Sequence, residues 1–463
     1  MDGQRLQSEV DGLRTRIEQL ERALADSEAR NRKLLDYIES LQRGHKRQAA
    51  PFSKGPPKPD PKTPGRKSGD AYGRHAHRQI PGIIHETFDA PLPLYCPDCS
   101  GIVNFEKVEA QYQTEIPRQP IHRQFNVHVG HCSCCRKRVQ GRHRLQTSDA
   151  LGAANSQIGP DAQALAVLLN KDAGLSHSKI SRFFQDAFGL AIVRATSART
   201  MLRAAKRLLP AYGEIQISVK SSDWTVPDET GWKVGGLLQW LHVFVTVHAT
   251  LYLIRPSRGF DVAEEALGAD YSGDMTHDGW SVYQQFYAAQ HGTCNGHLFV
   301  RCNRLLETAT GGAVNFPRRI KALLQAGLAV RDARDAGRIS HFKSTLFAGV
   351  LTSRLEKLCG PKTHPGNERL AKFLHWNRHD VFRYLSRPKL QATNWLAEQA
   401  LRPAIVNRKV WGGNRTENGA HAQGVLASVL RTLEQNGRRA LEFLSQTFRA
   451  PPGKAPGLLT SAI

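Results

Sequence analysis

The chain has 463 residues, with 64 Lys and Arg against 41 Asp and Glu, a formal net charge of +23 and a pI near 9.9. This length predicts two to four domains, and the charge predicts attraction to a polyanion such as nucleic acid, with an ordinary basic enzyme as the alternative. No run of about 18 apolar residues is present and the N-terminus is charged, so neither a membrane span nor a signal peptide is expected. In a reducing cytosol, the eight cysteines would be metal ligands or buried thiols rather than disulfides.

Residues 1–43 carry a heptad pattern that predicts a coiled-coil dimerisation arm. The a positions are Val10, Ile17, Leu24, Asn31 and Ile38, and the d positions are Leu6, Leu13, Leu20, Ser27, Leu34 and Leu41. β-branched residues at a with Leu at d favour two parallel helices, and Asn31 at an a position favours one register. The alternative is an amphipathic helix packed on its own chain. We expect a homodimer or higher assembly formed through residues 6–41.

Residues 44–90 are predicted to form a basic, proline-rich linker. Six prolines fall between positions 51 and 64, and this composition does not bury a core. Its positive charge would bind phosphates without reading sequence, with Arg66 and Lys67 as candidate DNA contacts. A solvated spacer is the alternative.

Residues 91–146 contain two Cys-x2-Cys pairs, which predict a zinc ribbon with one structural Zn²⁺. The expected ligands are Cys96, Cys99, Cys132 and Cys135. Cys134 and His131 leave the fourth ligand open, and redox-active or buried cysteines are the alternative. The stretches 108–112 and 125–129 alternate like the strands of a ribbon. The candidate DNA contacts after the second pair are Arg136, Lys137 and Arg138.

Residues 155–212 read as helices. Ser176 or Ser178 is expected to cap a helix that ends before Gly189, and Thr196 or Ser197 to open the next one. A helix, a Gly-containing break and a second helix resemble a helix-turn-helix that binds DNA. A structural helical bundle is the alternative.

Residues 220–450 carry three carboxylates in separate motifs. Asp228 lies at or near a first strand, with Glu229 as its alternative, and residues 240–247 and 250–254 should pair as a hairpin. Asp278 follows a third short segment, and 281–289 reads as a helix. Glu398 shares a helical face with Asn394 and Arg402, and Pro403 should kink or end that helix. Three carboxylates from distant segments suit a two-Mg²⁺ phosphoryl-transfer site in a ribonuclease-H-like domain.

The rest of this region is less specific. Residues 303–370 are expected to be a helical insertion, 422–448 one or two helices broken at Gly437, and 451–463 a flexible tail. Cys294 and His297 are either a packed structural pair or, with Cys302, a second metal site. The candidate DNA contacts near the last motif are Arg402, Arg408, Lys409 and Trp411. Trp411 would stack on an unpaired base, and a basic loop is the alternative.

Together these motifs resemble the DDE transposases of the insertion-sequence 66 family. The resemblance rests on Asp228-Glu-Thr-Gly-Trp232, Asp278-Gly-Trp280, Cys294-x2-His297 and Asn394-x3-Glu398-x-Ala-Leu-Arg-Pro403, and the order of motifs extends it over almost the whole chain. The chain departs from the family pattern at Asn295, Gly296 and Trp395. The resemblance implies that Asp228, Asp278 and Glu398 are catalytic residues that bind two Mg²⁺ or Mn²⁺ ions.

The expected architecture is therefore multidomain α+β: a coiled coil, a zinc ribbon, a helical or helix-turn-helix-like segment, and a ribonuclease-H-like α/β catalytic domain with a helical insertion. The expected function is a DNA transposase that binds the inverted repeats of its mobile element and performs cleavage and strand transfer. Its partners would be double-stranded DNA, a second copy of the chain and companion proteins of the element, with no membrane, in the bacterial cytoplasm near the nucleoid. The alternatives are a catalytically decayed zinc-containing DNA-binding regulator and a metal-dependent nuclease without strand transfer.

Overall fold

The fold comes from a computed structural model, which describes residues 81–451 except 109, 115, 117, 118, 142, 144 and 147–157, together with residues 19–21, 24, 27 and 456–459. Most of the expected dimerisation arm and linker, including Arg66 and Lys67, lies outside the described residues. The chain forms two compact units, residues 1–117 and 118–463. No helix in the described part of the chain is long and apolar enough to cross a membrane.

In the first unit, Tyr95 and Ile102 form an isolated antiparallel bridge around the turn that contains Cys96 and Cys99. The strand expected at 108–112 is wrong, because its described residues have no strand conformation. Val108 and Tyr112 are both exposed, so the alternating side chains have no buried face against which a strand would be stabilised.

The second unit begins with a short hairpin of β1 (Val129–His131) and β2 (Arg138–Gln140) around the second Cys-x2-Cys pair. Of the residues 125–129 expected to form a strand, only Val129, the first residue of β1, lies in one.

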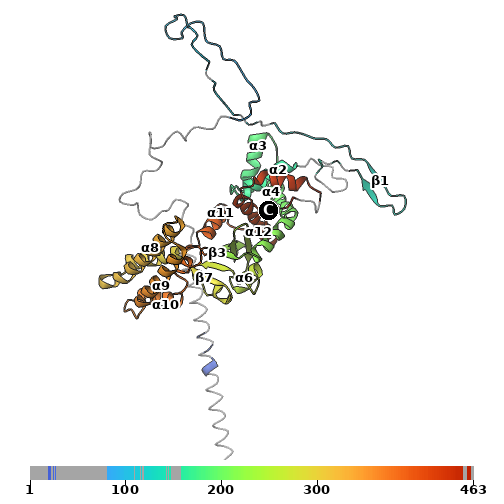
Figure 1. Cartoon of the computed structure of the whole chain (residues 1–463). Coiled ribbons are helices and arrows are strands. Elements are labelled where there is room, and N and C mark those ends of the chain that lie inside the picture. The colour runs from blue at the N-terminus through green and yellow to red at the C-terminus, as the bar shows by residue number, and fades with distance from the viewer. Residues whose placement is uncertain are drawn as a thin grey trace, which may run out of the picture. The chain divides into compact units, whose positions relative to one another are not determined.

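A five-stranded mixed sheet, in the order β5-β4-β3-β6-β7, is the centre of the second unit (Figure 1). The strands are β3 (Trp224–Val234), β4 (Leu237–Val245), β5 (Thr250–Arg255), β6 (Asp274–His277) and β7 (Gln290–Thr293). β3, β4 and β5 are antiparallel neighbours, which confirms the expected hairpin, whereas β6 and β7 run parallel to β3. Gly235 and Gly236, both with positive φ, connect β3 to β4, as a tight two-residue turn requires.

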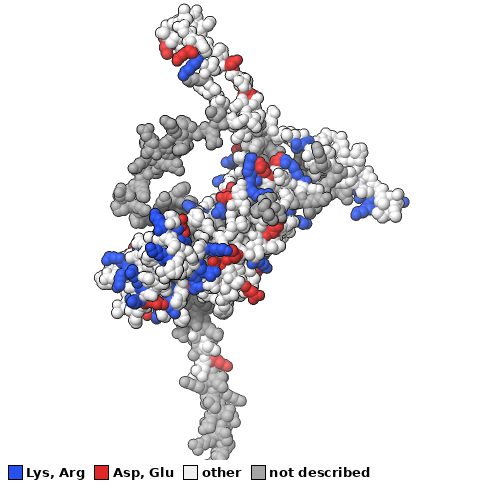
Figure 2. Space-filling view, viewed as in Figure 1, with Lys and Arg blue, Asp and Glu red and all other residues white. Residues whose placement is uncertain are grey.

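After β7 the chain enters a helical lobe with its own apolar core. Its helices are α7 (Asn295–Thr308), α8 (Asn315–Asp335), α9 (His341–Leu358) and α10 (Pro365–Trp376). Each helix contributes a buried aliphatic side chain to that core: Leu298, Ile320, Leu355 and Leu374. Figure 2 shows Lys and Arg side chains gathered over this lobe.

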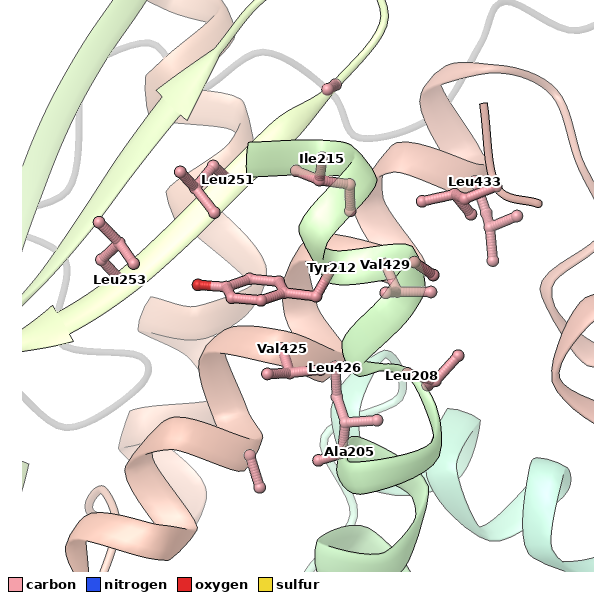
Figure 3. Close-up of a cluster of buried hydrophobic side chains, with 14 of the residues drawn as sticks. Ala205, Leu208, Tyr212, Ile215, Leu251, Leu253, Val425, Leu426, Val429 and Leu433 are labelled. Carbon is pink, nitrogen blue, oxygen red and sulfur yellow. The ribbon is translucent and has the colours of Figure 1, made fainter. Parts of the chain in front are cut away.

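The largest core lies on the other side of the molecule, between one sheet face and helices from both ends of the unit. These helices are α2 (Pro160–Lys171), α3 (His177–Phe188), α4 (Arg194–Arg207), α5 (Leu209–Lys220), α6 (Phe260–Leu267), α12 (Glu417–Gln435) and α13 (Ala440–Arg449). Figure 3 shows Tyr212 of α5, Leu251 of β5 and Leu426 of α12 in this cluster. The segment 155–212 is thus part of the same compact unit as the sheet.

Several boundaries follow the local chemistry of their residues. Ser176 accepts from the Lys179 N–H and Gly189 adopts a left-handed conformation, as expected for the ends of α3. α4 starts at Arg194, so the expected capping by Thr196 or Ser197 is wrong. The helix expected at 281–289 is also wrong: only a 3-10 turn, Tyr283–Gln285, forms.

Helix α12 covers the open edge of the sheet at β5. The backbone N–H groups of Thr250 and Tyr252 donate to the hydroxyls of Thr432 and Ser428, at 3.1 and 2.8 Å. Gly424 permits this approach, because a Cβ there would lie 3.0 Å from the Tyr252 carbonyl oxygen. The polar groups of the edge strand are therefore satisfied by side chains rather than by another strand.

Helix α11 (Trp395–Trp411) packs on the opposite sheet face through Ala397, Ala400 and Ala404. Pro403 lies inside this helix, so the expectation of an end there is wrong. The packing on the sheet, and a hydrogen bond of 2.6 Å from the Tyr252 hydroxyl to the Ala400 carbonyl, stabilise the helix across the proline.

The C-terminal segment differs from its expected flexible character. Leu458 is buried in the main core, and its N–H and that of Leu459 both donate to Glu214 at 2.9 Å. The described residues 456–459 are therefore packed against α5.

Candidate active site

The first two carboxylates lie on adjacent parallel strands, Asp228 within β3 and Asp278 directly after the end of β6. β3 pairs with β6 through Trp224 with Asp274 and Thr225 with Met275, which are 50 positions apart in the chain. The same offset aligns Asp228 with Asp278, the residue that follows β6. Parallel pairing therefore brings two residues from distant segments to the same part of the sheet.

Asp228 and Glu229 point to opposite faces of the sheet, because side chains alternate along a strand. Asp228 shares its face with Val226 and Trp232, where α11 packs. Glu229 faces the other side, where Arg258 donates to its Oε1 at 3.1 and 2.7 Å and the Tyr283 hydroxyl donates to its Oε2 at 2.7 Å. Glu229 is thus engaged in a buried ion pair, and Asp228 is the carboxylate that faces α11.

Glu398 lies in the first turn of α11, with its side chain 51% exposed. A carboxylate in this position interacts favourably with the N-terminal end of the helix dipole. Ala397, the preceding residue, is buried against the sheet and fixes which side of the helix Glu398 occupies. Packing of α11 therefore brings the third carboxylate to the face on which Asp228 lies.

The residues that immediately precede α7 and α11 are joined by a pair of reciprocal hydrogen bonds. The Cys294 thiol donates to Asn394 Oδ1 at 3.1 Å, and the Asn394 backbone N–H donates to Cys294 Sγ at 3.2 Å. The Asn394 amide also reaches Asp228 Oδ2 at 3.4 Å. Cys294 and Asn394 thus connect the start of α11, and so Glu398, to Asp228.

His297 makes the second connection between α7 and the carboxylates. Its Nδ1 lies 3.9 Å from Glu398 Oε1 and, among the described residues, has no hydrogen-bond partner. Cys302 instead lies buried in the core of the helical lobe. The geometry therefore favours a positioning pair, Cys294 and His297, over a second metal site with Cys302.

Burial and like charges raise the pKa of Asp228 to about 7. Burial is the largest cause, followed by the charge of Glu229, and the charges of Asp278 and Glu398 act in the same direction. The Glu229 backbone N–H, 2.8 Å from Asp228 Oδ1, opposes the shift by stabilising the carboxylate. Three carboxylates that repel one another in a partly buried setting form a site that a cation would stabilise.

The donor set fits hard divalent cations, because Mg²⁺ and Mn²⁺ prefer carboxylate oxygens and water. Among the described residues, no three His, Cys, Asp or Glu side chains already converge at metal-binding spacing. Glu398 is exposed and on the first turn of its helix, so its side chain is the one with room to adjust.

Arg258 forms a clamp beneath the Asp278 loop that the sequence did not predict. Its guanidinium stacks between the rings of Trp240 and Trp280, 4.4 and 3.0 Å from their centroids, while it holds Glu229. The Trp280 backbone N–H donates to Asp278 Oδ1 at 2.9 Å. The Arg258 clamp therefore links the buried ion pair to the orientation of Asp278.

Two buried histidines also fix this loop. The Gly279 N–H donates to His277 Nδ1 at 3.1 Å, so His277 Nε2 carries the proton shared with His291 Nδ1, also at 3.1 Å. His291 Nε2 then donates to the Phe286 carbonyl. Burial lowers the pKa of His277 to about 3 and also lowers that of His291, which keeps both rings neutral.

Comparison with known proteins agrees with this geometry. The sequence profile of the Transposase IS66 family matches residues 155–422, which include all three carboxylates. The chain belongs to the IS66 transposase family. It is also 24% identical over 215 residues to the uncharacterized protein y4qI of Sinorhizobium fredii (strain NBRC 101917 / NGR234). That match covers 42% of this chain and 39% of the relative, so the chain spans well under two thirds of the relative's length.

The expected DNA contacts of this IS66-family protein occupy different settings. Arg136, Lys137 and Arg138 are exposed, as are Arg402 and Lys409 on α11. Arg408 instead donates to the Thr230 hydroxyl and the Gly231 carbonyl of β3. Trp411 is half-buried against Trp232, with Lys171 over its ring, and its expected stacking on an unpaired base stays a prediction.

The two Cys-x2-Cys pairs of this IS66-family protein form similar turns. In each, the N–H of the fifth residue donates to the first cysteine's carbonyl, and that residue, Ser100 or Arg136, has a φ near +60°. Backbone N–H groups, first those of Cys99 and Cys135, lower the pKa of Cys96 and Cys132 respectively. Each turn therefore favours a thiolate, the form of cysteine that binds zinc.

The raised pKa of Asp228 predicts a pH dependence of stability without metal. The folded pKa of about 7 exceeds the ordinary value near 4, so the folded chain binds more protons between these pH values. The free energy of unfolding should fall as pH rises from about 4 to about 7, by at most about 4 kcal/mol. Asp228→Asn should reduce this slope in urea denaturation with EDTA, and Asp332→Asn, an exposed substitution, should not. If the pH dependence of the unfolding free energy is unchanged in Asp228→Asn, the proposed repulsion at this carboxylate is contradicted.

Loss of the Arg258 clamp should destabilise the fold, because it leaves the Glu229 carboxylate, 6% exposed, without its cation. We expect Arg258→Ala to cost about 3 kcal/mol in the free energy of unfolding. The matched control is Arg255→Ala: this arginine is as exposed as Arg258, but its partner Glu265 is 39% exposed, so the loss should be about 1 kcal/mol or less. Equal losses of unfolding free energy in the two variants, measured by urea denaturation, would contradict the special role of Arg258.

Proposed function

We propose that this protein is a DNA transposase that binds the terminal inverted repeats of its mobile element and catalyses phosphodiester cleavage and strand transfer. The observation that carries the proposal is the approach of Asp228, Asp278 and Glu398 from β3, the end of β6 and α11. The strand order supports a ribonuclease-H-like domain. The first of the five strands, β3, is central. On one side it continues into the antiparallel meander of β4 and β5, and on the other lie β6 and β7, both parallel to it.

Asp228, Asp278 and Glu398 would hold two Mg²⁺ or Mn²⁺ ions. When bound, such ions neutralise phosphate charge and lower the pKa of an attacking oxygen. The chain's own residues supply position: Asn394 orients Asp228, and the Arg258 clamp holds the loop of Asp278. The exposed Glu398 completes the site from the other element.

The reaction requires two in-line displacements. Water first attacks the phosphodiester at an element end, the P–O bond to the 3′ oxygen breaks, and a 3′-OH is left. That hydroxyl then attacks a target phosphodiester, and the target strand's own 3′ oxygen leaves. Neither step needs a protein nucleophile, so the protein contributes positioning and charge stabilisation.

DNA binding is supported by two basic surfaces of the second unit. On α4, Arg199, Arg203 and Lys206 are exposed at helical spacing, opposite the buried Met201 and Ala205. A helix with a basic outer face, preceded by α3 and the break at Gly189, suits the second helix of a helix-turn-helix. The helical lobe of α7–α10 adds the basic surface seen in Figure 2.

Dimerisation through residues 6–41 would hold two element ends together before joining. Leu20 and Leu24, both expected seam positions, are 58% and 61% exposed and helical in the single chain. Exposed leucines at a and d positions are available to pair with a second copy. Companion proteins of the element would act on this assembly.

The Cys96–Cys99 and Cys132–Cys135 turns are proposed to bind structural zinc. The support is their spacing in the sequence and the lowered thiol pKa within each turn. Zinc would then hold the basic residues that follow the second turn in a fixed conformation.

Substitution of a catalytic carboxylate should abolish joining while DNA binding persists. Asp278→Asn and Glu398→Gln should each lower strand transfer with Mg²⁺ at least about 100-fold, because each removes a metal-ligand charge. Glu265→Gln, at an acid that is 39% exposed and pairs with Arg255, is the control. Joining at the wild-type rate by either variant would exclude it from catalysis. DNA binding by the wild type without any cleavage would favour a regulator, and breaks without joined products would favour a nuclease.

Zinc content should depend on the cysteines at the ends of each turn. Cys132→Ser should weaken zinc binding at least about 10-fold, measured as zinc retained per chain after dialysis against a weak chelator. Cys134→Ser is the matched control, since this exposed cysteine lies inside the same turn. Retention of zinc by Cys132→Ser with loss in Cys134→Ser would reassign the ligand.

A further inference from the structure

The start of α11 exposes a large aromatic side chain beside the carboxylates. Trp395, the first residue of the helix, is 55% exposed, although tryptophan is usually well buried. The residue before it, Asn394, contacts Asp228, and Glu398 follows three positions later on the same helical face. The side chain of Trp395 thus lies at the rim of the candidate active site.

Trp395, Glu398 and Arg402 form one exposed stripe along α11. Their spacing of three and four residues places them in line, about 4.5 and 6 Å apart along the helix axis. The stripe offers an aromatic plane, a carboxylate and a guanidinium in sequence. These are groups that contact, in turn, a base, a metal-bound phosphate and a neighbouring phosphate.

We propose that Trp395 stacks on an unpaired nucleobase next to the phosphodiester held at Asp228, Asp278 and Glu398. The proposal rests on the proposed function for the placement of that phosphodiester. A paired base inside a duplex has both faces covered by its neighbours, so a stacking residue at this rim needs a base that has left the helix or lies at a strand end. Every base has an aromatic face, so such stacking tolerates any sequence.

The other exposed tryptophan of the molecule provides a matched control. Trp376, the last residue of α10, is 82% exposed and is also at a helix end. It lies on the helical lobe, and its described ring neighbour is His375, 6.5 Å away. Loss of a general aromatic surface would affect both tryptophans, whereas stacking at the active site would depend on Trp395 alone.

The test measures DNA binding by the full-length protein in buffer without Mg²⁺ or Mn²⁺, so that no phosphodiester is cleaved and the proposed zinc is retained. The probes are a blunt duplex and the same duplex with a three-nucleotide overhang that contains 2-aminopurine. The wild type should prefer the overhang and quench its fluorescence. Trp395→Ala should bind the overhang about 5- to 150-fold more weakly and lose both the preference and the quenching. Trp395→Phe should keep part of both, and Trp376→Ala all of both.

Three outcomes would overturn the proposal: quenching retained in Trp395→Ala, equal weakening for blunt and overhang duplexes, or equal effects of Trp395→Ala and Trp376→Ala. The second outcome would indicate a backbone contact, and a change in self-association of Trp395→Ala without a change in quenching would indicate a protein partner. Because the readout needs no catalysis, an absence of strand transfer by the wild type, which would contradict the proposed function, would leave this result unaffected.

Discussion

The parallel pairing of β3 with β6 is the constraint on which the site depends. It aligns two aspartates from distant segments, and it does so at a cost, since burial and neighbouring charges raise the pKa of Asp228 to about 7. The surrounding structure keeps this unfavourable arrangement in place. Asn394 holds Asp228 from α11, while the Arg258 clamp and the His277–His291 pair hold the loop of Asp278. A cation bound between these carboxylates would relieve their repulsion.

The third carboxylate depends on a different kind of contact. Ala397, Ala400 and Ala404 let α11 lie close against the sheet, and this packing determines the orientation of Glu398. The Cys294–Asn394 hydrogen bonds then fix where the helix begins relative to α7. These hydrogen bonds hold α7 and α11 in one relative position. They also connect the helical lobe to the carboxylates.

Sequence reasoning succeeded where local chemistry decides the structure. The ends of α3 at Ser176 and Gly189, the hairpin of β4 and β5, and the break at Gly437 follow from capping, alternation and backbone freedom. It failed where packing decides. The alternating residues at 108–112 have no buried face to pack against, and Pro403 is tolerated inside a packed helix. In the candidate site, the order of the motifs predicted the three carboxylates. Arg258 could not be predicted, because its partners lie on other elements and no local sequence pattern indicates its contacts.

The covering of β5 by α12 limits how copies of this chain can associate. The Ser428 and Thr432 hydroxyls already occupy backbone donors that a neighbouring strand would use, and at the other edge the Thr293 N–H donates to the Asp380 carbonyl. A second copy therefore cannot join by extending the sheet at these positions. A dimer of this chain would therefore form through side-chain surfaces and would leave the sheet that carries the carboxylates intact.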